Sequence, residues 1–333
     1  MRAGIVFAGQ GAQYPGMGQD LCEHSAAAKE IFEAAGEQVR NWCFHGTKEM
    51  LRQTNITQPS IYTVTMAAYR ALQEALDAHA ELSEQLEIIG YAGFSLGEYA
   101  ALTAAGSIRD IADGQDIVTR RGHFMNEAGK DADGNQRGGM AAAFGRREDI
   151  CAAIEAVRGD DILTAANFNS PIQTVAAGEK PALQRFVDHA GECGLKAKML
   201  SVSTAFHSPM MEPAAAQLEQ LLRQKDLQAP RQKIYSNTTA RDLMEDFDGG
   251  STGGYLAERM ARQAMRPVYW QETIENMIAD GAQVFIEVGP GRTLSGLIRK
   301  IRHGMPTLHV EDSESLAKTI EQLEKQLHEG EVR

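Results

Sequence analysis

The sequence contains few cysteines and no long apolar run. Its four cysteines, Cys22, Cys43, Cys151 and Cys193, lie far apart and form no CxxC pair, so they offer neither zinc-ligand spacing nor a dense disulfide framework. No stretch approaches the ~18 apolar residues of a membrane span, and the apolar run at the start is too short for a secretory signal. We therefore expect a cytoplasmic protein with reduced cysteines, no metal site and no membrane contact.

Basic residues are also scarce. There are 33 Lys and Arg against 45 Asp and Glu, which gives a net charge of −12. This balance argues against nucleic acid or an anionic membrane surface as the main partner. The 333 residues, 43% of them hydrophobic, suffice for one large domain or two ordinary ones without help from disulfides or metal.

Strand patterns alternate with helical patterns along most of the chain. Short buried-strand runs occupy residues 5–8, 88–92 and 284–288, and helical stretches occupy residues 62–80 and 95–105. This alternation predicts a mainly parallel α/β sheet.

A polar, glycine-rich segment at residues 129–139 marks a loop or a domain boundary. After it, strands are predicted at residues 140–144, 174–177 and 198–202, and helices at 147–157 and 181–193. We expect an inserted subdomain at residues 130–204 within a core formed by residues 1–129 and 205–310.

Three further elements are predicted in the last third of the chain. Ser208 followed by Pro209 predicts a capped helix to about residue 223, and residues 249–254 predict a flexible loop. Leu316, Ile320, Leu323 and Leu327 recur at helical spacing, so residues 311–333 are predicted to form an amphipathic helix.

Residues 93–97 (GFSLG) form a G-x-S-x-G motif directly between a predicted strand and a predicted helix. Glycines at both ends allow the strained turn that exposes a nucleophilic serine beside a helix N-terminus. The motif therefore indicates a catalytic Ser95. The alternative is a serine that only caps the helix.

A nucleophilic serine needs a general base, and nine histidines are candidates. His207 stands out because it precedes the predicted capped helix and has small or apolar neighbours; a buried structural histidine is the alternative. No Asp or Glu occupies an obvious orienting position, so the third member is expected to be a backbone carbonyl or an amide side chain.

A series of segments resembles the malonyl-CoA:acyl carrier protein transacylases of fatty acid and polyketide synthesis. In order, they are residues 7–18 (FAGQGAQYPGMG), 93–99 (GFSLGEY), 121–125 (RGHFM), 167–171 (NFNSP), 205–209 (AFHSP) and 287–291 (EVGPG). The resemblance runs from about residue 5 to about residue 301. It implies an α/β-hydrolase-like core with a parallel sheet and an inserted small ferredoxin-like α+β subdomain.

The resemblance also assigns roles to the catalytic residues. Ser95 would attack the thioester of malonyl-CoA, and His207 would take its proton and later activate the thiol of an acyl carrier protein. The main-chain carbonyl of Gln263 would orient His207, and the backbone N–H groups of Gln10 and Leu96 would form the oxyanion hole. The transfer would be ping-pong, without a cofactor.

The substrate is assigned in the same way. Arg121 would hold the malonyl carboxylate with a bidentate, charge-assisted grip. A solvated helix arginine is the alternative for Arg121. Asn167 and Gln13 are expected to line the pocket, with a structural role as the alternative.

Two positions depart from the family pattern: Phe94 stands where histidine is usual, and Ala8 where proline is usual. We expect neither to abolish the activity of Ser95. The segment at residues 205–207 (AFH) favours malonyl over bulkier extender units.

Several other functions remain to be separated from this one. The glycine loop at Gly9 does not continue as G-x-G-x-x-G, which disfavours a dinucleotide-binding oxidoreductase. An acyl-thioester hydrolase that edits carrier proteins, a malonyl transacylase of malonate decarboxylase and a catalytically silent scaffold are the remaining alternatives. Arg121 favours the transferase over the hydrolase.

Expected partners are malonyl-CoA and an acyl carrier protein, and the chain is expected to be a monomer. Because the carrier proteins of this family are acidic, their docking face should be basic. The densest basic group consists of Arg292, Arg299, Lys300, Arg302 and His303. A solvated helix end is the alternative for this group.

Overall fold

The computed structural model describes residues 1–202 and 204–331. Its larger sheet has five parallel strands in the order β7-β2-β1-β8-β9. The strands are β1 (Arg2–Phe7), β2 (Glu87–Gly93), β7 (Ile234–Tyr235), β8 (Val284–Val288) and β9 (Thr307–Val310). The prediction of a parallel α/β sheet is confirmed.

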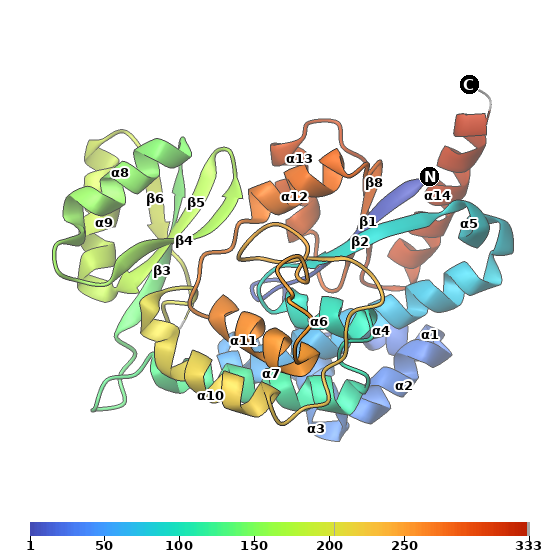
Figure 1. The fold of residues 1–333 in the computed structure, drawn as a ribbon, viewed down its shortest axis with the longest axis horizontal. Helices are drawn as coiled ribbons and strands as arrows, with labels where there is room; N and C mark the ends of the chain where they lie inside the picture. Colours follow the sequence, from blue (N-terminus) through green and yellow to red (C-terminus); the bar gives the residue numbers. More distant parts are fainter. Residues whose placement is uncertain (203, 332–333) are drawn as a thin grey trace.

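Helices cover both faces of this sheet (Figure 1). The central strand β1 shows why: Ile5 and Phe7 pack into one apolar cluster and Val6 into another, as expected for a strand buried on both faces. Helices α12 and α13 pack against Val6, whereas α4 and α6 lie on the opposite face with α7, α10 and α11 beyond them. The helices of this part are α1 (Gln19–His24), α2 (Ala26–Ala35), α3 (Glu37–His45), α4 (Thr54–Ala78), α5 (Ala80–Gln85), α6 (Gly97–Ala104), α7 (Ile111–Ala128), α10 (Glu212–Leu222), α11 (Thr252–Gln263), α12 (Trp270–Ala279), α13 (Thr293–Ile301) and α14 (Ser313–Glu331), with short 3-10 turns at Met50–Arg52 and Pro209–Met211.

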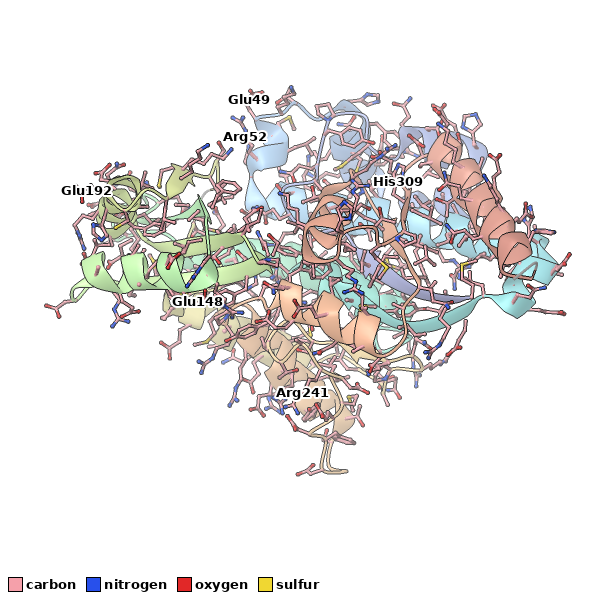
Figure 2. The ribbon with its side chains drawn as sticks, turned by 90° about the horizontal axis from the view of Figure 1, so that it is seen from above. Glu49, Arg52, Glu148, Glu192, Arg241 and His309 are labelled. Atoms are coloured by element: carbon pink, nitrogen blue, oxygen red, sulfur yellow. The ribbon has the colours of Figure 1, made fainter. Side chains whose placement is uncertain are left out.

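A second, antiparallel sheet lies at one end of the molecule (Figure 1). Its strand order is β4-β5-β3-β6, and its helices α8 and α9 share an apolar core with it that includes Ile150 and Phe186. The elements are β3 (Gly138–Phe144), α8 (Arg147–Arg158), β4 (Leu163–Ser170), β5 (Gln173–Glu179), α9 (Lys180–Glu192) and β6 (Lys196–Met199). In Figure 2, Glu148 and Glu192 mark this end of the molecule, and His309 marks the larger sheet.

The antiparallel sheet corrects three predictions. Strand β4 was not expected, because its sequence (LTAANFNS) mixes polar and apolar residues without strict alternation. The last strand is Lys196–Met199, not residues 198–202, and it pairs antiparallel with β3. Gly138 and Gly139 lie in β3 and not in the preceding loop.

Helix boundaries differ as well. Helix α4 begins at Thr54 and not at residue 62, because packing on all sides stabilises a first segment that contains Pro59. The Ser208 hydroxyl does not cap a helix: it donates to the carbonyl of Ala205 at 2.7 Å. Residues 252–254 form the first turn of α11, which the Ser251 hydroxyl caps.

The amphipathic C-terminal helix is present as α14, with Ile320 and Leu323 buried. Residues 332–333 of the predicted helix and residue 203 of the predicted subdomain lie outside the described residues. The exact domain limits at residues 129, 130, 204, 205 and 310 stay a prediction.

Candidate active site

The turn between β2 and α6 carries Ser95 in a strained conformation. Its φ is 53°, in the left-handed region that costs a non-glycine residue about 1–3 kcal/mol. A Cβ on Gly93 would lie 1.9 Å from the backbone carbon of Gly97, and one on Gly97 would lie 2.2 Å from the carbonyl oxygen of Phe7. Both flanking positions therefore require glycine, as the motif predicts.

His207 meets Ser95 across 112 residues of sequence. The Ser95 hydroxyl donates to Nε2 of His207 at 2.7 Å. On the other side of the ring, Nδ1 lies 2.9 Å from the carbonyl oxygen of Gln263 and 3.1 Å from that of Arg266. Because both partners of Nδ1 can only accept, the proton of a neutral ring belongs on Nδ1 and Nε2 is free to act as a base.

Burial keeps this histidine neutral. Removal from water, followed by the charge of Arg121, lowers the pKa of His207 to about 4, although the two carbonyls act in the opposite direction. The imidazole is therefore in its basic form at neutral pH. The second carbonyl, from Arg266, was not predicted.

Arg121 is a buried cation surrounded by neutral acceptors. Its side chain is 1% exposed, with Nη1 2.7 Å from Oε1 of Gln58 and Nη2 3.2 Å from Oε1 of Gln263 and 3.3 Å from Oγ of Ser95. Its Nε has no hydrogen-bond partner, and no Asp or Glu among the described residues forms an ion pair with it. Burial lowers the pKa of Arg121, yet a guanidinium remains protonated in proteins, so the site favours an anionic group.

These side chains line a cavity of about 250 Å³ between the two sheets. The larger sheet and its helices contribute the reactive groups Ser95, His207 and Arg121. The antiparallel sheet and the segment after it contribute Met140, Ala142, Asn167, Asn169, Gln173, Val175, Leu200 and Val202.

Two of the three predicted substrate-binding residues lie at the cavity. Arg121 and Asn167 line it, and Asn167 is 5% exposed on β4. Gln13 is not among the lining residues: its Oε1 accepts from the backbone N–H of Gly11 at 2.8 Å, which stabilises the loop after β1. The structural alternative therefore describes Gln13 better.

The expected oxyanion-hole donors flank the nucleophile. Over the described ranges, the backbone N–H groups of Gln10 and Leu96 donate to no other protein group. Gln10 lines the cavity, and Leu96 directly precedes α6. Free donors at these places can bind the oxygen of a tetrahedral intermediate.

Phe94, the main departure from the family pattern, contacts Trp270 edge-to-face at 5.3 Å between ring centroids. It lines the cavity and has no group that transfers protons. Apolar packing thus occupies the position, in agreement with a supporting role.

Comparison with known proteins identifies the family. The family described as acyl transferase domain matches residues 5–328. The chain belongs to this acyltransferase family. It is 32% identical to the malonyl CoA-acyl carrier protein transacylase of Bacillus subtilis over 97% of both chains, and 32% identical to that of Escherichia coli K12 over 95% of this chain and 98% of the relative.

Solved structures of acyltransferases share the fold. The malonyl CoA-acyl carrier protein transacylase of Clostridium perfringens has a TM-score of 0.88 at 35% identity and covers 99% of this chain and 100% of its own. The malonyl-transacylase PlMCAT was solved with its type II polyketide acyl carrier protein AntF. It has a TM-score of 0.86 at 31% identity, and the match covers 97% of this chain and 100% of PlMCAT.

Three polar residues of this acyltransferase site were not predicted. Gln58 binds Arg121, Asn237 accepts from the backbone N–H of Ser95 at 2.7 Å, and Glu98 accepts from Gln263 at 2.9 Å. Gln58 and Asn237 lie in segments without a recognisable motif. Glu98 did carry a signal, because it is a carboxylate in the first turn of a helix rich in Ala and Leu.

Other candidate sites give little. Within residues 1–202 and 204–331, no group of three or more His, Cys, Asp or Glu side chains could hold a metal ion. No helix in the same ranges is long and apolar enough to cross a membrane. All four cysteines are free thiols.

Proposed function

We propose that this acyltransferase moves a malonyl group from malonyl-CoA to the phosphopantetheine thiol of an acyl carrier protein through a malonyl-Ser95 intermediate. The observation that carries the proposal is Arg121, a buried cation without a carboxylate partner that lies 3.3 Å from the nucleophile. A carboxylate one methylene away from the reacting carbonyl, as in malonyl, would supply the missing anion.

The first half of the reaction loads the enzyme. Oγ of Ser95 attacks the thioester carbonyl while its proton passes to Nε2 of His207. The negative oxygen of the tetrahedral intermediate binds the backbone N–H groups of Gln10 and Leu96. When the C–S bond breaks, His207 returns the proton to the CoA sulfur, and malonyl remains as an ester on Ser95.

The second half reverses these steps with a new thiol. His207 takes the proton of the phosphopantetheine thiol, whose sulfur attacks the ester carbonyl. The C–O bond to Ser95 breaks, and the proton on His207 returns to the serine oxygen. The chain requires no cofactor in this scheme, because every proton is moved by His207.

Carrier docking is proposed at the basic group of Arg292, Arg299, Lys300, Arg302 and His303. All five are exposed. Helix α13 places Leu294 and Leu297 against the cavity, and Nζ of Lys300 lies 3.5 Å from Oε1 of Gln173, another lining residue. The basic group therefore adjoins the cavity that the phosphopantetheine arm must enter.

The finer fold assignment is also a proposal. The order β3-α8-β4-β5-α9-β6 with strand order β4-β5-β3-β6 supports a ferredoxin-like subdomain, and the serine turn on a parallel sheet supports an α/β-hydrolase-like core. The monomeric state and the cytoplasmic location stay predictions.

The decisive experiment follows labelled malonyl from malonyl-CoA in the presence and absence of holo acyl carrier protein. Label should appear on the wild-type protein and pass to the carrier, whereas Ser95→Ala should carry none. Ser107→Ala is the control, since Ser107 is a buried serine that follows the far end of α6 and lies outside the cavity; it should label normally.

Other outcomes identify the alternatives. Rapid release of free malonate would assign a thioester hydrolase instead. Stable labelling of Ser95 without transfer to any acyl carrier protein would contradict the proposed acceptor and favour the carrier of a malonate decarboxylase. A labelled Ser95→Ala would remove Ser95 as the nucleophile.

A further inference from the structure

Glu98 is a fully buried carboxylate one turn beyond the nucleophile, and the mechanism above does not use it. Its Oε2 accepts from Nε2 of Gln263 at 2.9 Å, and its Oε1 accepts from the backbone N–H of Asn237 at 3.2 Å. The backbone N–H of Asn237 can only donate, and Gln263 donates in its observed orientation, so this arrangement requires a group that accepts on both sides. An ionised carboxylate meets that requirement, and an amide does not.

The two partners of Glu98 hold the backbone of the nucleophile. Nε2 of Gln263 donates to the carbonyl of Ser95 at 2.7 Å, and Oδ1 of Asn237 accepts from the backbone N–H of Ser95 at 2.7 Å. Asn237 also donates to the carbonyl of Gly93 at 2.6 Å. Glu98 therefore binds the side-chain amide of Gln263 and the backbone of Asn237, the two residues that hold the backbone of Ser95.

The orientation of the Gln263 amide links Glu98 to Arg121. With Nε2 facing Glu98 and the Ser95 carbonyl, Oε1 must face Arg121, whose Nη2 lies 3.2 Å away. A flipped amide would set its oxygen against two acceptors and its N–H groups against the guanidinium, which is repulsive on both sides.

We propose that Glu98 is a positioning residue that, through Gln263, holds Arg121 in place for the substrate carboxylate and so sets the preference for malonyl over acetyl groups. The proposal rests on the carboxylate-binding role of Arg121. Glu98 does not line the cavity and forms no hydrogen bond with Arg121; Gln263 is the hydrogen-bonded link between them.

Substitution by glutamine is the sharpest test because it preserves shape. An amide at position 98 must turn its NH₂ either toward the backbone N–H of Asn237 or toward Nε2 of Gln263. In the first orientation the backbone N–H of Asn237 loses its acceptor. In the second, Gln263 flips and its NH₂ group faces the guanidinium of Arg121. We expect Glu98→Gln to lower the ratio of malonyl to acetyl kcat/KM about tenfold.

If the role of Glu98 were purely structural, Glu98→Gln would lower the malonyl and acetyl kcat/KM values in proportion and leave their ratio unchanged. Thr319→Val is the matched control: Thr319 is also buried and donates to the carbonyl of His309 at 2.8 Å, but it lies on α14. Its ratio should equal that of the wild type. An unchanged ratio in Glu98→Gln would overturn the proposal.

A pH series on the wild-type protein gives a second measurement that needs no variant. Burial raises the pKa of Glu98 to about 7, partly offset by its hydrogen bonds and by the charge of Arg121. The other titratable neighbours keep one state from pH 6 to 8: Arg121 is charged, the pKa of His207 is about 4, and burial raises the pKa of Tyr99 to about 12. The malonyl carboxylate also stays ionised.

Because only the ionised form of Glu98 accepts on both oxygens, the malonyl-to-acetyl ratio should fall as the pH drops from 8 to 6. The ratio of Glu98→Gln should stay flat over this range. If Glu98→Gln does not fold, the wild-type series decides, and a flat wild-type ratio would overturn the proposal.

Two reference measurements separate this proposal from the ones it depends on. Absence of malonyl transfer by the wild-type protein would refute the proposed function itself. An unchanged ratio in Arg121→Ala would refute the role of Arg121. With both references as expected, an unchanged ratio in Glu98→Gln refutes only the role of Glu98.

Discussion

The cavity lies between two sheets that contribute different kinds of side chain. On the side of the parallel sheet, Ser95, His207 and Arg121 form a connected set of hydrogen bonds that continues below the surface through Gln263 and Glu98. On the side of the antiparallel sheet, the described lining residues are apolar or carry neutral amides. The parallel-sheet side thus carries the reactive groups, and the antiparallel-sheet side encloses the cavity.

The difference follows from topology. The carboxyl ends of parallel strands meet at one edge, where successive turns bring distant residues together. The turn after β1 supplies Gln10 and the turn after β2 supplies Ser95. An antiparallel sheet instead packs one broad face against the rest of the protein. Ala142 and Val175 on that face form an apolar wall of the cavity.

The largest effect is expected on the charged side, from Arg121→Ala. Arg121 is the only buried cation among the described residues that line the cavity. Its loss removes the proposed partner of the malonyl carboxylate, so malonyl kcat/KM should fall about 100- to 1,000-fold. Acetyl transfer should rise relative to malonyl transfer, because no unpaired charge is left behind. Arg120→Ala is the control: Arg120 is exposed and pairs with Asp116. Equal malonyl-to-acetyl ratios in the two variants would contradict the division.

More of the reactive side of the cavity, with Ser95, His207 and Arg121, than of its apolar side could be predicted from the sequence. The turn at Ser95 was predictable because its two glycines form a local sequence motif, although the contact that requires Gly97 comes from the distant Phe7. The lack of an orienting acid was also predictable, and two backbone carbonyls take that place. Gln58 and Asn237 could not be found, because their roles depend on distances between segments that no local pattern encodes.

The wall was harder to predict for a different reason. Strand β4 carries Asn167 and Asn169 toward the cavity, and these amides interrupt the alternation that reveals a strand. The net charge of −12 was likewise too coarse a guide to ligand charge. Arg121 inside the cavity and the basic group beside it place positive charge where the proposed anionic ligands would bind, against the sign of the net charge.

A smaller effect is expected where the two parts meet at the cavity mouth. Lys300 on α13 contacts Gln173 on β5, so Lys300→Glu should oppose an acidic carrier and raise its KM about three- to tenfold, more at low salt than at high salt. Loading of Ser95 from malonyl-CoA should be unchanged. Lys318→Glu is the control, since Lys318 is exposed on α14 and pairs with Glu314. Identical carrier KM values for both variants would place docking elsewhere.

The smallest effect on chemistry is expected at the seam between the sheets. The guanidinium of Arg147 on α8 lies 3.5 Å from the ring centroid of Phe168 and pairs with Glu272 on α12. Arg147→Ala should lower the free energy of unfolding by about 1–2 kcal/mol and leave the malonyl-to-acetyl ratio unchanged, because Arg147 does not line the cavity and is not a hydrogen-bond partner of Arg121. Arg146→Ala, which removes only exposed ion pairs, should change neither quantity in chemical denaturation and transfer assays. A shifted ratio in Arg147→Ala would mean that the wall also helps to select the substrate.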